Sequence, residues 1–260
     1  MYIAHIQLAC FRDAQLSELN WAITGFIDAL RDNGQLLGRE FPTQMVDACF
    51  TTRVVLPAKD SLNGIYDSPS VKHWRHTLNQ VGLTTPRVKI DGIDLHSDHS
   101  DQCQQRNWQV LFTNYLSSCS PLRCGNDFAP IPLYTLPRLG EHDYRPILRW
   151  QQAWAALDEL QIQGTYSAVE SQALFELGSI DSELFAKGYA IAQSIERLSD
   201  TPTYYYLYRV GGESLSQEKQ LTCPKCKSDW LLDQPLFDVF DFKCDACRLV
   251  SNLSWNLQGS

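Results

Sequence analysis

Two Cys-x-x-Cys pairs limit what this 260-residue chain can fold into more than any other feature of its sequence. The first is Cys223-Pro-Lys-Cys226 and the second is Cys244-Asp-Ala-Cys247, with seventeen residues between them. Each short turn presents two thiolates, and a hairpin between the pairs brings all four to one tetrahedral ion. The pattern therefore predicts a single structural Zn²⁺ ion held by Cys223, Cys226, Cys244 and Cys247. Four protein ligands leave no open coordination position, so we expect no catalytic role for this metal.

The remaining cysteines and the N-terminus indicate the compartment. Residues 1–7 contain a His and a Gln where a signal peptide needs an apolar run, and nothing approaches the roughly 18 apolar residues of a membrane span. We therefore expect a cytoplasmic protein that does not contact a membrane. The other five cysteines are odd in number and irregularly spaced, as is typical of thiols in a reducing compartment: Cys10, Cys49, Cys103, Cys119 and Cys124.

The first half of the chain alternates between strand-like and helix-like segments. This order predicts an α+β or α/β domain over residues 1–140, with a β-α-β-α-β-β arrangement of sheet and helices. A proline-rich stretch follows, with a short strand over residues 131–136. The expected strands cover residues 1–10, 50–56, 86–91 and 108–116, and the expected helices cover residues 17–31 and 69–80.

The second half begins with a helical segment that ends in a Tyr-rich strand, and together they form the predicted domain 141–212. Its helices are expected over residues 143–163, 167–177 and 181–198, with Asp181 as the N-cap of the last. The strand covers residues 203–210. A zinc ribbon is predicted for residues 213–260, and its aromatic side chains exceed what so small a module can bury alone. Some of them should therefore pack on the rest of the protein or on a partner.

Charge is concentrated in the middle of the chain. The formal net charge is -8, and residues 141–200 carry four basic and ten acidic groups, which gives -6. This acidic helical segment suits a protein partner with a basic surface, since opposite fields speed encounter. A toxin antidote that covers a basic active-site cleft is one concrete form of this hypothesis.

Binding of nucleic acid through the zinc ribbon is the alternative hypothesis. It needs an excess of Lys and Arg, and the composition does not supply one. Five aspartates surround the cations of the ribbon, which are Lys225, Lys227, Lys243 and Arg248. The tyrosines at positions 204, 205, 206 and 208 could stack on bases, but a packed β-strand explains them better.

Two further groups of ligand-type residues leave a second metal site open. A polar loop contains His96 and His99 together with Asp94, Asp101 and Cys103. A solvated loop explains this group as well as a metal does. Near it in the sequence, Cys119 and Cys124 could form a redox pair or half of a metal site, although two buried thiols are the simpler interpretation.

The chain resembles a family of proteobacterial proteins of unknown function. The resemblance rests on Ser120-Pro-Leu-Arg-Cys-Gly125, on Pro132-Leu-Tyr134 and on the C-terminal Cys-x-x-Cys pairs, and it covers most of the chain. Members of this family are described as zinc-ribbon-containing, candidate nucleic-acid-binding proteins. The resemblance implies that the four cysteines of the ribbon are metal ligands, and it names no other functional residue.

Familiar catalytic motifs are absent from the sequence, including the Gly-x-Ser-x-Gly elbow, the Walker loop and His-Glu-x-x-His. We therefore expect a non-enzymatic, zinc-binding protein that binds a macromolecule, with a protein partner favoured over nucleic acid. An enzyme whose site is spread along the sequence is a second alternative, and it predicts a deep polar pocket away from the ribbon.

Overall fold

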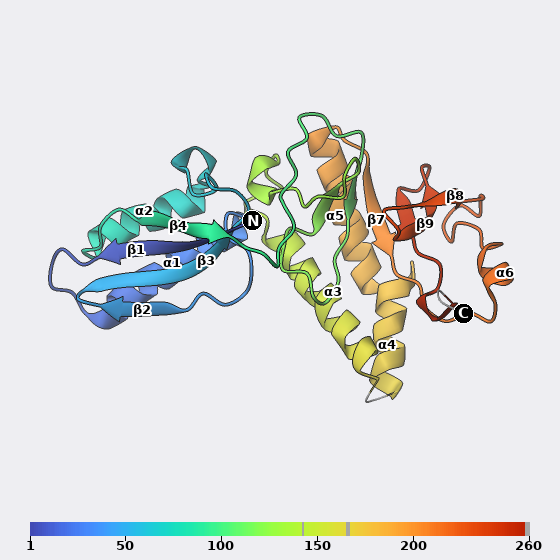
Figure 1. Ribbon diagram of the computed structural model, residues 1–260, viewed down its shortest axis with the longest axis horizontal. Coiled ribbons are helices and arrows are strands. Elements are labelled where there is room, and N and C mark those ends of the chain that lie inside the picture. Colours follow the sequence, from blue (N-terminus) through green and yellow to red (C-terminus); the bar gives the residue numbers. More distant parts are fainter. Residues whose placement is uncertain (142, 165–166, 258–260) are drawn as a thin grey trace. The chain divides into compact units, whose positions relative to one another are not determined.

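The computed structural model describes residues 1–141, 143–164 and 167–257, and it shows a mixed α+β protein with two separate sheets (Figure 1). The chain forms two compact units. Unit 1 comprises residues 1–102, 118–120 and 129–145, and unit 2 comprises residues 103–117, 121–128 and 146–260. Residues 258–260 of the predicted ribbon lie outside the described residues.

Unit 1 is a four-stranded antiparallel sheet with the strand order β2-β3-β1-β4 and two helices. The chain order is β-α-β-β-α-β, which is the ferredoxin-like arrangement. Its elements are β1 (Tyr2–Ala9), α1 (Leu16–Asp32), β2 (Thr43–Val46), β3 (Cys49–Leu56), α2 (Pro69–Gln80) and β4 (Arg87–Ile93), with a short 3-10 turn at Gly64–Tyr66.

Alternation along β1 explains how unit 1 forms its core. Ala4, Ile6 and Leu8 are fully buried, whereas the intervening side chains are only half-buried, because successive side chains of a strand point to opposite faces. The buried face packs against apolar residues of α1 such as Phe26 and Leu30, which recur at helical spacing. Both helices therefore pack on the same face of the sheet.

Helix α2 begins where the sequence predicts it. The Ser68 hydroxyl accepts a hydrogen bond from the backbone N–H of Val71 at 3.2 Å and caps the helix. Pro69 occupies the first turn, where its missing N–H has no consequence. These two residues together fix the first residue of the helix.

Unit 2 contains a mixed six-stranded sheet with the order β6-β5-β7-β10-β9-β8. Strands β5, β7 and β10 run parallel, and the other pairs are antiparallel. The elements are β5 (Gln109–Leu111), β6 (Leu122–Cys124), α3 (Arg145–Gln163), α4 (Ser167–Gly178), α5 (Glu183–Ser199), β7 (Thr203–Leu207), α6 (Leu215–Glu218), β8 (Leu231–Leu236), β9 (Phe240–Cys244), β10 (Leu249–Ser251) and the 3-10 turn Trp255–Leu257.

Strand β7 is the centre of this unit. All five of its residues are buried, as expected for a strand covered on both faces. Tyr205 contacts Trp150 and Phe185 edge to face, with ring centroids 5.8 and 5.2 Å away. Tyr206, on the opposite face, lies 5.5 Å from Phe240 of the ribbon. The Tyr-rich strand is therefore a packed core strand, which confirms the favoured interpretation over a base-stacking platform.

Three local predictions need correction, and two strands were not expected. Residues 131–136 form no strand, because Leu133–Thr135 is a 3-10 turn whose Tyr134 is buried and hydrogen-bonded to Ser61. The N-cap of α5 is Ser182, not Asp181, since its hydroxyl accepts from the N–H of Phe185 at 3.0 Å. Of the strand expected over residues 108–116, only β5 (Gln109–Leu111) is present. Strands β2 and β6 were not expected from the sequence.

Among the residues that the structure describes, no helix has both the length and the apolar character needed to cross a membrane.

Candidate metal centre

The four predicted cysteines meet at one point of unit 2. Their Sγ atoms all lie within 4.8 Å of one another, and those of Cys226 and Cys244 are 3.5 Å apart. Cys223, Cys244 and Cys247 are buried and Cys226 is exposed. This set, called the four-cysteine cluster below, is arranged as a metal site requires, with one edge open to solvent.

The first knuckle is shaped by backbone hydrogen bonds. The N–H of Lys227 donates to the carbonyl of Cys223 at 2.8 Å, and Lys227 takes a left-handed conformation with φ of 63°. The N–H of Cys223 in turn donates to the carbonyl of Ser228 at 2.9 Å. This tight turn points both thiols of the first pair to the same side.

The protein environment acts on the individual thiols in different ways. Hydrogen bonds from the side chain and backbone of Ser228 lower the pKa of Cys226 to about 6. Burial, followed by the neighbouring thiols of Cys226 and Cys244, raises the pKa of Cys247 to about 12. Without metal, Cys226 is thus ready to bind as a thiolate, whereas Cys247 must lose a proton. Ser228 escaped the sequence analysis, although its position two residues after a ligand was the available signal.

The hairpin between the two knuckles joins the cluster to the sheet. Trp230 stacks on Phe242 with ring centroids 5.0 Å apart, and its indole N–H donates to the carbonyl of Leu221 at 3.0 Å. Phe240 and Phe242 are fully buried in unit 2. The aromatic surplus of the ribbon therefore packs on the rest of its own unit, as one of the two expected outcomes.

A hydroxyl on β7 also reaches the second knuckle. Tyr204 donates to the carboxylate of Asp245 at 2.5 Å, and Asp245 forms an ion pair with Lys243. Arg248 donates to the backbone carbonyl of Asp245 at 2.8 Å. The turn that contains two of the four cysteines is thereby held from both sides.

Three of the four cations of the ribbon contact other side chains of unit 2. The ammonium of Lys225 lies 4.0 Å from the ring centroid of Tyr189, a cation–π contact. Arg248 pairs with Glu196 at 3.2 Å, and Lys243 pairs with Asp245. Three of the four cations that the nucleic-acid hypothesis needs therefore already have a partner.

Part of the acidity of residues 141–200 is also used internally. Asp158, Glu176 and Glu196 accept hydrogen bonds from backbone N–H groups at 2.9, 3.0 and 2.9 Å. Burial raises the pKa of Asp158. The charge that this segment presents to solvent is smaller than the sequence indicates.

The other predicted ligands behave differently. Within the described parts of the chain, neither His96 nor His99 belongs to a cluster of three or more metal-type side chains. Cys119 and Cys124 are both buried, as expected for structural thiols. The sulfur of Cys124, however, lies near that of Cys103 and near a carboxylate oxygen of Asp127. The sequence placed Cys103 and Cys124 in two separate groups of candidate ligands, and nothing in it pointed to Asp127 or to a meeting of the two sulfurs.

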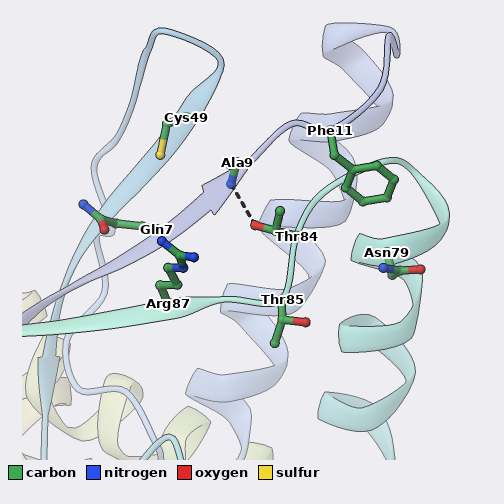
Figure 2. A pocket seen from close by; sticks show the side chains of 8 residues that line it. All are labelled: Gln7, Ala9, Phe11, Cys49, Asn79, Thr84, Thr85 and Arg87. Carbon is green, nitrogen blue, oxygen red and sulfur yellow. Dashed lines mark hydrogen bonds between the residues drawn. The ribbon is translucent and has the colours of Figure 1, made fainter.

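Unit 1 contains a pocket of about 510 Å³ at one end of its sheet, where β1, β3 and β4 begin or end (Figure 2). Gln7 and Arg87 are paired residues of β1 and β4, and Figure 2 shows their side chains next to each other. The backbone N–H of Ala9 donates to the Thr84 hydroxyl at 3.0 Å. Arginine, amide and hydroxyl groups together can bind a small anion. The lining residues are Gln7, Ala9, Phe11, Cys49, Asn79, Thr84, Thr85 and Arg87.

Three family models match successive parts of the chain. Residues 1–92 match Domain of unknown function (DUF8589), residues 103–208 match Domain of unknown function (DUF2310), and residues 212–257 match Domain of unknown function (DUF8594). A solved structure from Deinococcus radiodurans, described provisionally as an antibiotic biosynthesis monooxygenase, covers 39% of this chain and all of its own. Its sequence identity to this chain is 11% and its TM-score is 0.27.

Two relatives come from Haemophilus influenzae, and each is described as "Uncharacterized protein". The first is 41% identical over 238 residues, which are 90% of this chain and 90% of the relative. The second is 45% identical over 178 residues, which are 68% of this chain and 87% of the relative. At these levels of identity and coverage, the chain belongs to the same bacterial family as the two Haemophilus proteins.

Proposed function

We propose that this protein is a non-enzymatic, zinc-stabilised binding protein and that its partner is another protein. The four-cysteine cluster would hold one structural Zn²⁺ ion, and unit 2 would present the binding surface.

Zinc is the metal that best suits the four-cysteine cluster. A tetrahedral set of four sulfurs is typical of Zn²⁺ or of iron–sulfur centres, and two Cys-x-x-Cys knuckles on a hairpin are typical of zinc ribbons. Reduced thiolates of this kind persist in the cytoplasm, which is where we place the protein. The ion would contribute folding free energy of about 10 kcal/mol, the scale of structural zinc sites.

Helix α4 forms the main part of the proposed binding surface. Among the residues of this helix, all of them described, only Ala173 and Leu177 are buried, whereas Val169 and Phe175 are 44% and 47% exposed. At the end of α3, Leu160 is 43% exposed and Ile162 is 52% exposed, and Figure 1 shows this end next to the start of α4. We call residues 159–163 and 167–178 the helical arm. Apolar side chains that stay exposed on two neighbouring helices can contribute to an interaction site.

Charge favours a particular kind of partner. Glu159 and Glu170 belong to the helical arm, and the segment 141–200 as a whole has a net charge of -6, from four basic and ten acidic residues. A complementary partner would have an apolar patch bordered by Lys and Arg. The engaged cations of the ribbon and the buried tyrosines of β7 support a protein over a nucleic acid.

Metal analysis tests the first half of the proposal. Full-length protein should lose one equivalent of zinc when Cys223 and Cys226 are both replaced by Ser, and Tyr–Trp fluorescence should report loosened packing around Trp230. Cys119→Ser is the matched control, because it removes a buried thiol outside the cluster and should leave the zinc content unchanged. Equal zinc in the double variant and the wild type would refute the metal assignment.

Cross-linking in the native host tests the second half. Phe175→Ser with Ile162→Ser should abolish one protein cross-link that the wild type forms. Gln172→Ser with Gln163→Ser changes exposed polar residues of the same helices and should preserve it. Loss in both variants, or retention in both, would contradict a role for the helical arm. Recovery of nucleic acid in place of a protein would favour the alternative function.

A further inference from the structure

We propose that Cys103, Cys124 and Asp127 form a second binding site for a thiophilic divalent cation, with Zn²⁺ as the best-suited ion. The two sulfurs and a carboxylate oxygen of Asp127 lie within 4.8 Å of one another. All three residues belong to unit 2, and none is part of the four-cysteine cluster. We call this trio the second cluster.

The local fold fixes two of the three ligands. Cys124 is the last residue of β6, and Asp127 lies in the turn that follows. The N–H of Phe128 donates to the carbonyl of Cys124 at 2.9 Å and closes this turn. The N–H of Gly125 donates to the carbonyl of Trp108 at 2.8 Å, and a Cβ on Gly125 would collide with the Trp108 ring at 2.3 Å. A glycine is therefore required between the two ligands.

Asn126 connects the third ligand to this turn. Its backbone N–H donates to Cys124 Sγ at 3.4 Å, and its side-chain Nδ2 donates to Cys103 Sγ at 3.8 Å. The same Nδ2 donates to the carbonyl of Gln105 at 3.1 Å, and Oδ1 accepts from the N–H of Asn107 at 3.4 Å. One residue thus holds the segment 103–107 against β6 and supplies donors to both sulfurs.

The hydrogen bond to Cys124 repeats a feature of the four-cysteine cluster. There, the backbone N–H two residues after the ligand donates to the sulfur of Cys223 and to that of Cys226, from Lys225 and Ser228 respectively. Such N–H···S bonds stabilise thiolates and orient metal ligands. The donor to Cys124 has the same offset of two residues, so this cysteine is prepared as a metal-binding cysteine is.

Ligand type and exposure define the expected ion and its behaviour. Two thiolates with one carboxylate suit zinc, whereas Mg²⁺ and Ca²⁺ prefer oxygen ligands alone. Cys124 is fully buried, Cys103 is half-buried and Asp127 is exposed, so solvent and chelators can reach the ion from one side. The second cluster should therefore release zinc to a chelator before the four-cysteine cluster does.

Zinc stoichiometry of the full-length protein tests the proposal. After saturation with zinc under reducing conditions and removal of free metal, the wild type should contain about two equivalents, and Cys103→Ser should contain about one. Asp127→Asn, an exposed and conservative change, should weaken the second equivalent at least tenfold without affecting the first. Cys49→Ser is the control, because loss of this half-buried thiol of unit 1 should leave both equivalents in place.

Three results would overturn the second cluster. One is a wild-type protein that holds a single equivalent at saturation. Another is Cys103→Ser protein with the same zinc content as the wild type. The third is a Cys103–Cys124 disulfide in the zinc-saturated protein, detected by mass spectrometry of peptides. Cobalt substitution adds a second readout, since the two thiolate ligands of the second cluster should add charge-transfer absorbance to that of the four-cysteine cluster, and only this added part should be lost in Cys103→Ser.

Discussion

The hydroxyl of Tyr189 donates a hydrogen bond to the backbone carbonyl of Cys247 at 2.9 Å. Tyr189 lies on α5 and Cys247 is the last residue of the four-cysteine cluster, so a helix 58 positions earlier in the chain holds the second knuckle in place. The same tyrosine ring lies under the ammonium of Lys225 from the first knuckle. One side chain therefore supports both halves of the metal site.

Tyr189→Phe should lower zinc affinity by about tenfold, the lower end of the effect of residues that orient metal ligands. The ring and its cation–π contact remain, and only the hydrogen bond to Cys247 is lost. Competition with a chromophoric chelator measures the change. Tyr208→Phe is the control, since it loses a hydrogen bond with Gln161 away from the cluster. Equal affinities for both variants would show that the hydroxyl of Tyr189 has no role at the site.

Gly188→Ala should reduce the free energy of unfolding by about 1–3 kcal/mol, the usual cost of overpacking. The added Cβ would lie 2.3 Å from the Trp150 indole nitrogen and 2.4 Å from a ring carbon of Tyr205. Helix propensity favours Ala over Gly by about 1 kcal/mol. A net loss of stability would therefore show that the steric clash of the added Cβ outweighs this gain. Denaturant unfolding measures the free energy of unfolding. Ala186→Ser, on the exposed side of α5, is the control and should change this free energy little.

Glu218→Ala should destabilise unit 2 by about 1.5–3 kcal/mol, the scale of hydrogen bonds between charged groups, because it removes the buried carboxylate that binds the half-exposed Arg209. Glu218 is 2% exposed, and Arg209 Nε donates to its carboxylate at 2.7 Å. The exposed pair Lys187–Glu183 offers a comparison, and Lys187→Ala should have no measurable effect. Thermal unfolding of both variants measures their losses of stability. Similar losses would contradict the expectation that burial makes the Arg209–Glu218 pair the stronger one.

Zinc affinity of the four-cysteine cluster should rise with pH between about 6 and 9. The pKa of Cys247 is raised to about 12, so this thiol is protonated in the metal-free protein at neutral pH and must release its proton on binding. The pKa of Cys226 is lowered to about 6, so its protonation weakens binding further only below that pH. Chelator competition at several pH values, with proton release measured by calorimetry, tests both statements. An affinity independent of pH would contradict them.

Local signals in the sequence were sufficient where a structure depends on neighbouring residues. Ser68 and Pro69 predicted the start of α2, and a run of β-prone residues predicted β1. The two Cys-x-x-Cys pairs predicted the four-cysteine cluster, because each knuckle is local and the hairpin leaves few ways to join them. The α+β class followed from the order of these elements.

Non-local pairings were beyond the sequence. Strand β6 has three residues and exists because it pairs with β5, and β2 is an exposed edge strand without apolar alternation. Cys103 meets Cys124 through contacts of Asn126, which no spacing rule describes. The segment 131–136 resembles a strand in sequence because it is rich in apolar residues. In the structure these residues are buried around a 3-10 turn.

The strand order of unit 2 has a consequence for synthesis of the chain. Strand β7 lies between β5 and β10, and β10 begins at Leu249. During translation, the flank of β7 that pairs with β10 stays unpaired until β10 has left the ribosome, as an edge prone to pairing with other chains. Metal capture by the cysteines would then hold β10 in place at the end of folding. Cells short of zinc should accordingly accumulate this protein as aggregates of newly made chains, while chains completed earlier stay intact.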